Sequence, residues 1–174
     1  MVTRRELGNT VQQTPEQILI DMLAPLPGER VLDAGCGLGR STAALAATGA
    51  SLTGIDIQAP LLEQARLACP AAEFFAADLL AWTAPQPFDA IYAFATLHWV
   101  QPPLDAARAL HALLRPGGRL AVAFGGLSPV ARELEGCYQP TPRDYQRVLE
   151  RAGFAMLELR PGDSHFFVLA RREQ

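Results

Sequence analysis

A turn with alternate glycines joins a predicted strand to a predicted helix near the start of the chain. The run from Val31 to Gly39 reads Val-Leu-Asp-Ala-Gly-Cys-Gly-Leu-Gly, so an apolar strand ends at an acid just before three glycines. Glycines let the backbone turn sharply and let a ligand approach closely, and the start of a helix offers free N–H groups. The run therefore predicts a strand and a helix, the opening unit of an α/β fold, joined by a loop that either binds a ligand or is simply a tight strand-to-helix connection.

Strand and helix patterns alternate along the rest of the chain. Two Thr-Pro pairs, at residues 14 and 141, carry capping signatures that begin helices. The turn at 161–163 is short enough to make the last two strands antiparallel. We predict further helices over 60–69 and 104–114, and strands over 30–33, 51–56, 73–76, 88–93, 119–124, 154–159 and 165–171. The expected fold is α/β, a three-layer αβα sandwich with a seven-stranded, mostly parallel sheet whose last strand is antiparallel.

Length and composition predict one domain, residues 1–174. With 49% hydrophobic residues the chain can close a sizeable core, and its apolar runs are too short to cross a bilayer. Arg4 and Arg5 are not followed by an apolar segment, so no secretory signal is predicted. We therefore expect a cytoplasmic protein without a membrane partner.

Cysteine usage and net charge narrow the range of ligands. Cys36, Cys69 and Cys137 form an odd set without metal-ligand spacing, which favours free thiols in a reducing compartment and no metal site. A net charge of −3 gives no overall drive towards nucleic acid. A nucleic-acid partner is therefore disfavoured.

Carboxylates stand at the ends of the first three predicted strands. Asp33 would meet a ligand's ammonium group, directly or through water, or would tie down the glycine loop. Asp56 can accept both hydroxyls of an adenosine ribose, or can cap the turn before Pro60. Asp78 can accept from an adenine amino group while Leu79 offers a backbone N–H, or Asp78 can serve as a loop cap. These acids predict an adenosine-containing ligand.

A dinucleotide site is the natural rival, because it uses the same corner of the fold. Its fingerprint requires a third glycine where this chain has Arg40. Asp33 would repel a pyrophosphate and would suit the cationic amino acid portion of S-adenosylmethionine. The residues therefore favour S-adenosylmethionine over NAD.

Five segments taken in order resemble the successive motifs of class I, Rossmann-like methyltransferases. They are the loop from Asp33 to Gly39, Gly54-Ile55-Asp56, Asp78, Phe88-Asp89-Ala90-Ile91, and the run from Leu114 to Leu120. The run from Ala93 to Val100 is most similar to the trans-aconitate and malonyl-carrier-protein methyltransferase branch. That branch carries a related Leu-Gln-Trp segment, and this chain has His98 in place of the glutamine.

The resemblance implies an S-adenosylmethionine-dependent methyltransferase that releases S-adenosylhomocysteine. The glycine loop should surround the methionine portion, the second strand end the ribose and adenine, and the fourth strand end the sulfonium. The expected cofactor-binding residues are Asp33, Gly35, Cys36, Gly37, Asp56, Ile57, Ala77, Asp78, Leu79, Phe94 and Ala95.

The family commonly carries a helical lid after the fifth strand, which forms the acceptor pocket. In this chain only the segment from Gly125 to Pro140 separates that strand from the next helix, so the lid is reduced. The acceptor pocket is then open, completed by residues 1–13, or completed by a second subunit. We accordingly expect a monomer or a homodimer.

Methyl transfer from a sulfonium is an in-line displacement that needs no obligatory catalytic side chain. An amine, phenol or hydroxyl acceptor needs a base, and His98 follows the fourth strand at the ligand edge; the alternative is a packed histidine bonded to backbone. A carboxylate acceptor needs a cationic anchor instead. The candidates for that anchor are Arg4, Arg5, Arg40, Arg132 and Arg143.

Other chemically capable residues are expected to be structural. Trp99 should be core or pocket wall, and Tyr138 a surface loop residue with a weaker claim to acceptor contact. His111 lies inside a helix away from the ligand edge, and His165 should be an exposed edge residue. Nothing near Cys36 indicates a thiolate nucleophile, so its thiol is assigned to packing.

The leading hypothesis is methyl transfer to a small-molecule acceptor. A non-catalytic S-adenosylmethionine-binding subunit or sensor is an alternative prompted by the reduced lid. A protein or RNA methyltransferase is another, since an open cleft suits a large substrate. An NAD-dependent oxidoreductase is disfavoured by Arg40 and Asp33.

Overall fold

A single sheet runs through the protein, which is described by a computed structural model over residues 13–125, 130 and 133–173. Its strands are β1 (Arg30–Ala34), β2 (Ser51–Asp56), β3 (Glu73–Ala76), β4 (Phe88–Phe94), β5 (Leu114–Gly125), β6 (Phe154–Pro161) and β7 (His165–Arg172). Within the described residues these seven strands lie in the order β3-β2-β1-β4-β5-β7-β6. Strand β7 runs opposite to the other six strands, so the predicted sheet, mostly parallel with an antiparallel last strand, is confirmed.

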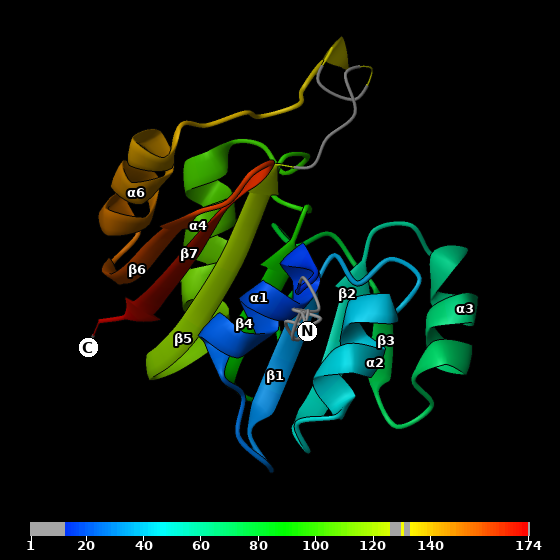
Figure 1. Cartoon of the computed structure of the whole chain (residues 1–174). Coiled ribbons are helices and arrows are strands. Elements are labelled where there is room, and N and C mark those ends of the chain that lie inside the picture. Colours follow the sequence, from blue (N-terminus) through cyan, green and yellow to red (C-terminus); the bar gives the residue numbers. More distant parts are fainter. Residues whose placement is uncertain (1–12, 126–129, 131–132, 174) are drawn as a thin grey trace, which may run out of the picture.

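Helices cover both faces of the sheet (Figure 1). They are α1 (Pro15–Leu23), α2 (Arg40–Ala46), α3 (Leu61–Ala68), α4 (Pro103–Leu113) and α6 (Pro142–Arg151). Leu19, Leu45 and Leu62 pack α1, α2 and α3 into one apolar cluster. Leu110 and Leu149 pack α4 and α6 into another on the opposite face. The predicted three-layer sandwich is therefore confirmed, and each fully buried leucine contributes about 1.5–3 kcal/mol.

Both predicted capping signatures begin helices, with different geometry. The Thr14 hydroxyl accepts from the Gln17 N–H at 3.2 Å, but the Gln17 amide donates to Asp21 at 2.7 Å instead of returning to the cap. Thr141 and Asp144 form a complete capping box. In α6 the N–H groups of Thr141 and Asp144 are thus each satisfied by the side chain of the other residue.

Strand β5 begins earlier than the predicted range of 119–124. Leu114 pairs with Phe88 of β4, and the register shifts between Phe88 and Ala90. This pairing draws the Arg-Pro-Gly-Gly run at 115–118 into the strand as an irregular extension. The helix before it consequently ends at Leu113, one residue before the predicted end.

The order in which the chain adds strands to the sheet shows at which edge a ligand is expected to bind. After β1 the chain builds β2 and β3 on one side, and β4 then returns to the other side of β1. The ends of β1 and β4 meet at this switch point, where ligands of open α/β sheets bind. No helix among the described residues is long and apolar enough to span a membrane.

Candidate cofactor site

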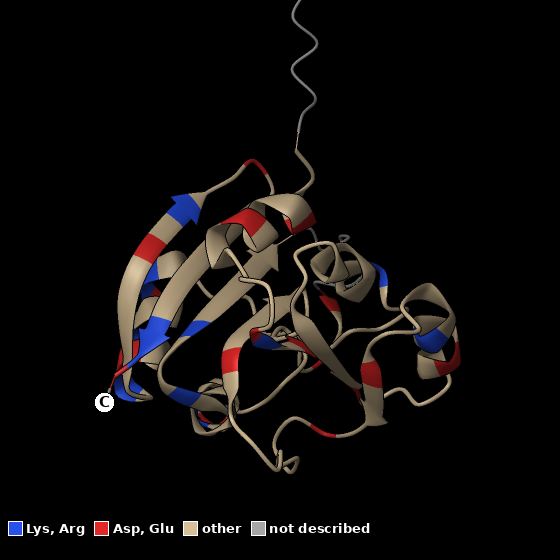
Figure 2. Cartoon of the chain, turned by 90° about the horizontal axis from the view of Figure 1, so that it is seen from below, with Lys and Arg blue, Asp and Glu red and all other residues tan. Residues whose placement is uncertain are grey.

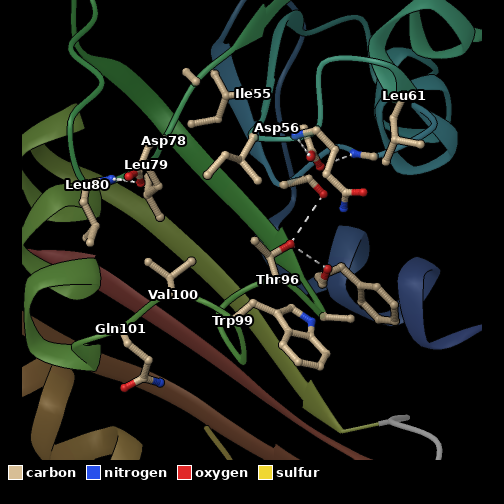
Figure 3. A pocket seen from close by; sticks show the side chains of 17 residues that line it. Ile55, Asp56, Leu61, Asp78, Leu79, Leu80, Thr96, Trp99, Val100 and Gln101 are labelled. Atoms are coloured by element: carbon tan, nitrogen blue, oxygen red, sulfur yellow. Dashed lines mark hydrogen bonds between the residues drawn. The ribbon is translucent and has the colours of Figure 1, made fainter. Parts of the chain in front are cut away.

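A cavity of about 440 Å³ opens at the carboxyl ends of β1, β2 and β4 (Figure 3). In Figure 3, Asp56 and Asp78 reach it from different strand ends, and Trp99, Val100 and Gln101 lie across from Asp56. Nine of the predicted cofactor-binding residues line it: Gly35, Gly37, Asp56, Ile57, Ala77, Asp78, Leu79, Phe94 and Ala95. The sequence had singled out Trp99 as core or pocket wall. The other lining residues, which had been given no site role, are Ile55, Gln58, Leu61, Leu80, Thr96, Val100 and Gln101.

The glycines of the loop after β1 serve different purposes. The N–H groups of Gly35 and Cys36 donate to the Ile55 carbonyl at 2.8 and 3.0 Å, which fixes the loop against β2. A Cβ added to Gly35, whose φ is +79°, would lie 2.1 Å from the Thr96 hydroxyl oxygen. A Cβ on Gly37 would meet nothing within 4 Å. Gly35 is thus needed for close packing of two loops, and Gly37 leaves open space where a ligand fits.

Asp56 takes the capping role that was the alternative for its position, and it also holds the glycine loop. Its Oδ2 accepts from the Gly37 N–H at 2.9 Å, and its Oδ1 accepts from the Gln58 N–H at 2.8 Å. The carboxylate therefore holds the glycine loop and caps the turn after β2. It also lines the cavity, and each of its oxygens keeps a lone pair for a ligand.

Asp78 is exposed and organises the turn after β3. Its Oδ1 accepts from the Leu80 N–H at 2.9 Å, and its carbonyl accepts from the N–H groups of Ala81 and Trp82. This is the loop cap foreseen as the alternative role. The carboxylate lines the cavity at the same time, beside the buried Leu79.

Asp33 lies behind the glycine loop and is outside the cavity lining. Its side chain is 1% exposed and accepts from the Thr42 hydroxyl at 2.6 Å, which ties β1 to α2. Burial raises the pKa of this carboxyl to about 7; the Thr42 hydrogen bond opposes the shift, and the charge of Asp56 adds to it. Asp33 is therefore a buried acid whose surroundings favour its neutral form more than water does.

Cys36 points away from the cavity into the core. Its sulfur lies 2.9 Å from the place where a Cβ on Gly54 would stand. Burial, with smaller effects from Asp33 and Asp56, raises the pKa of the Cys36 thiol to about 12. The thiol stays protonated and packs, and the three cysteines are all free.

The segment after β4 forms the second wall of the cavity. Ala95 has a φ of +52°, a left-handed conformation that costs a non-glycine residue about 1–2 kcal/mol. The Thr96 hydroxyl can donate to the Phe94 carbonyl oxygen at 3.0 Å or to the Gly35 carbonyl oxygen at 3.4 Å, and its side chain packs against Gly35. The strained segment is thereby held against the glycine loop.

His98 does not line this cavity. Its side chain is 2% exposed, and its ring meets Phe124 edge-on at a centroid distance of 4.8 Å. The Gly125 N–H donates to Nε2 at 3.2 Å, and Nδ1 lies 3.0 Å from the Tyr138 carbonyl oxygen. Burial lowers the pKa of His98, so the ring is neutral at neutral pH. Its role as a base remains a prediction, made for a ring whose two nitrogens are already hydrogen-bonded.

Two of the residues expected to be structural differ from expectation. His165 is half-buried, with its ring stacked near Phe94 at 5.5 Å and Phe167 at 6.0 Å, so the prediction of an exposed edge residue is wrong. Tyr138 is also half-buried, and its ring packs edge-on against Phe124 at 6.2 Å. The pairing of β5 with β7 brings His165 close to Phe94, and no local sequence pattern reveals this contact.

The remaining candidates lie away from the cavity. His111 meets Phe154 edge-on at 5.2 Å on the α4 side of the sheet. Arg40 and Arg143 are exposed at the starts of α2 and α6 and are not among the cavity-lining residues. The other three arginines proposed as anchors, Arg4, Arg5 and Arg132, lie outside the described residues, as do residues 1–12 and part of the reduced lid.

The charge of the cavity favours a cationic ligand. Among the described residues its lining contains two carboxylates, those of Asp56 and Asp78, and no arginine. Phosphate-binding sites offer positive charge and free N–H groups, and two acids would repel a pyrophosphate. The described groups include no cluster of three or more potential metal ligands.

Comparison with known proteins places the chain in a family. Residues 31–118, just over half of the chain, match the family model of the methyltransferase domain. The chain belongs to the methyltransferase family. The matched residues of this chain run from β1 into β5 and include every described residue that lines the cavity. The predicted resemblance to class I methyltransferases is confirmed.

Individual relatives agree with this assignment. A trans-aconitate 2-methyltransferase of Paracidovorax citrulli is 46% identical over 110 residues, which cover 59% of this chain and 42% of the relative. The chain thus spans less than half the length of the curated relatives that it matches. Trans-aconitate methyltransferases are one of the two groups in the branch that the run from Ala93 to Val100 was predicted to resemble.

Solved structures share the fold over most of the chain. A TehB-like S-adenosylmethionine-dependent methyltransferase of Corynebacterium glutamicum has a TM-score of 0.73 and 25% identity, and covers 91% of this chain and 87% of its own. The N-methyltransferase NodS of Bradyrhizobium japonicum, in complex with S-adenosylhomocysteine, has a TM-score of 0.76 and 20% identity, with coverages of 91% and 86%. The second likeness concerns the fold alone.

Proposed function

We propose that this methyltransferase binds S-adenosylmethionine in the cavity at the carboxyl edge and transfers its methyl group to a small-molecule acceptor. The observation that supports this proposal is that two carboxylates and the open face of Gly37 lie together in a cavity whose described lining contains no arginine. Its volume of about 440 Å³ lies in the range of ligand pockets. The cofactor's sulfonium and ammonium charges complement these acids.

The proposed contacts follow the order of the strands. Asp56 accepts the ribose hydroxyls with its remaining lone pairs, and Ile57 covers the adenine. Asp78, with Ala77 and Leu79 on either side of it, receives the adenine edge. These residues form the half of the cavity that lies at the ends of β2 and β3.

The other half of the cavity receives the methionine portion. Gly35 and Gly37 allow its close approach, and the backbone of Phe94 and Ala95 lines the sulfonium end. Asp33 acts from behind the loop through its charge, whereas Cys36 contributes its backbone to the loop and its thiol to the core. The predicted set thus separates into lining residues and supporting residues.

Bound S-adenosylmethionine supplies an already activated methyl group. The protein's contribution is to hold the acceptor in line with the sulfonium and to exclude water. The names of the trans-aconitate relatives support a carboxylate acceptor, which needs a cationic anchor and no base. The anchor is proposed among Arg4, Arg5 and Arg132, because Arg40 and Arg143 stand away from the cavity.

A macromolecular acceptor has less support. Acidic and basic residues are interspersed along the described elements in Figure 2, without a continuous basic stripe in that view. Binding to nucleic acid draws on such a stripe. We propose a cytoplasmic location on the strength of the free cysteines.

The test is isothermal titration with S-adenosylmethionine, S-adenosylhomocysteine and NAD, followed by an assay with trans-aconitate and related carboxylates. Binding of both adenosyl ligands without NAD is expected, with acceptor-dependent formation of S-adenosylhomocysteine. Binding of NAD alone, or of no ligand, would refute the cofactor. Binding without turnover on carboxylates, amines or hydroxyl compounds would favour a non-catalytic subunit.

A further inference from the structure

One imidazole, that of His98, joins Gly125 and Tyr138, which lie near the two ends of the segment from Gly125 to Pro140. Gly125 is the last residue of β5, and its N–H donates to Nε2 of His98. Nε2 must then carry a lone pair, which places the proton on Nδ1 for donation to the Tyr138 carbonyl. The Tyr138 N–H donates in return to the His98 carbonyl at 2.7 Å. Three segments distant in sequence thus meet at one side chain.

The same segment carries a wall of the cofactor cavity. Trp99, Val100 and Gln101 follow His98 directly and line that cavity. The Trp99 N–H donates to the Thr96 carbonyl at 3.0 Å, and Thr96 packs against Gly35. The start of the wall is therefore tied to the glycine loop through Thr96 and to Gly125 and Tyr138 through His98.

We propose that His98 is a positioning residue, whose neutral imidazole fixes the wall formed by Trp99, Val100 and Gln101 relative to β5 and Tyr138. The inference rests on the proposed function, since the wall matters through the cofactor. It assigns His98 a role other than proton abstraction. The competing explanation is simple packing against Phe124, to which the ring presents its edge.

Two substitutions separate positioning from packing. His98→Phe keeps a planar ring against Phe124 and removes both ring hydrogen bonds, which leaves the Gly125 N–H and the Tyr138 carbonyl without this partner. His98→Gln removes the ring and keeps an amide that can accept from Gly125 or donate to Tyr138. Positioning predicts that the glutamine variant binds ligand better than the phenylalanine variant, whereas packing predicts the reverse order.

The matched control is His111→Phe. His111 also meets a phenylalanine edge-on, and burial lowers its pKa as it does for His98. It lies on α4, whose residues do not line the cofactor cavity. A general effect of replacing a packed histidine would appear in this variant too.

The experiment is titration of the full chain and its variants with S-adenosylhomocysteine, together with thermal unfolding. Losing two hydrogen bonds should weaken binding about tenfold in His98→Phe, with a loss of about threefold or less in His98→Gln and none in His111→Phe. The proposal would be overturned if the His98→Phe variant bound S-adenosylhomocysteine as tightly as the wild type does, or more tightly than the His98→Gln variant does. Absence of binding by the wild type would instead refute the proposed function.

A measurement on the wild type keeps the proposal open to refutation if His98→Phe fails to fold. Long-range proton–nitrogen NMR reports the tautomer of each histidine ring. We expect a protonated Nδ1 and an unprotonated Nε2 for His98 at neutral pH. A ring protonated at Nε2 could not accept from Gly125, and that result would overturn the proposed link.

Discussion

The carboxylate of Asp56 accepts a hydrogen bond from the backbone N–H of Gly37 at 2.9 Å, so an acid at the end of β2 holds the loop that follows β1. The two residues face the same cavity. The glycine loop is therefore shaped before any ligand arrives, and the residue proposed to hold the ribose also sets the place of the methionine portion.

Asp56→Asn should weaken binding of S-adenosylmethionine roughly thirtyfold, because hydrogen bonds to a charged acceptor contribute about 1.5–3 kcal/mol. Isothermal titration measures the loss. Asp105→Asn, a change at a half-exposed acid on α4, is the control and should bind like the wild type. Equal affinities for the two variants would remove Asp56 from the proposed site.

Asp33 should release protons when the cofactor binds near neutral pH. Burial raises its pKa to about 7, and a nearby positive ligand favours the carboxylate, so affinity should rise as pH rises through about 7. Titration at pH 7 in phosphate and in Tris buffers reports the released protons through the different buffer ionisation enthalpies. In Asp33→Asn both the proton release and the dependence of affinity on pH should disappear; their persistence would assign them to another group.

Two glycines of the same loop should respond differently to alanine. Gly35→Ala forces a Cβ into Thr96 at a φ of +79° and should destabilise the fold by more than about 2 kcal/mol. Gly37→Ala meets open space and should cost about 1 kcal/mol in backbone strain, while it fills part of the cavity and weakens cofactor binding. Denaturant unfolding and titration measure the two effects. Similar stabilities would contradict the close contact of Gly35 with Thr96.

The histidines should make the protein less stable in mild acid. Burial lowers the pKa of His98, His111 and His165 below the ordinary value of 6.5. At these three histidines the unfolded chain then binds more protons than the folded chain below pH 6.5, so their contribution to the free energy of unfolding falls as pH falls through that value. The raised pKa of Asp33 contributes with the opposite sign. Subtracting the unfolding curves of His98→Gln from those of the wild type isolates the share of His98 from that of the nearby His165. If the difference in free energy of unfolding between the wild type and His98→Gln did not change between about pH 5 and 8, His98 would not contribute to the pH dependence of stability.

Much of the fold was predictable because local patterns and tertiary packing agree. The apolar runs of β2 and β3 end where predicted, since each meets turn residues directly. The start of β5 was not predictable, because Arg-Pro-Gly-Gly is a helix-stop signal and only its pairing with β4 extends the strand.

The candidate site was predictable where backbone direction decides it. Acids at strand ends necessarily gather at one edge of a parallel sheet, which brings Asp56 and Asp78 to the cavity. The side of the loop from which a residue acts was not predictable, so Asp33 and Cys36 lie behind it. Val100 and Gln101 were missed because they reach the cavity through the fold of their segment, which His98 anchors.

Every described residue that lines the cavity lies between Gly35 and Gln101, and the described chain beyond α4 adds β5, α6, β6 and β7. Among the described residues, the proposed cofactor site is consequently built by the first part of the chain, and the later segments would remain for contact with an acceptor. A chain arranged in this way can exchange its acceptor preference by insertion or replacement after β5 without rebuilding the means of holding the methyl donor.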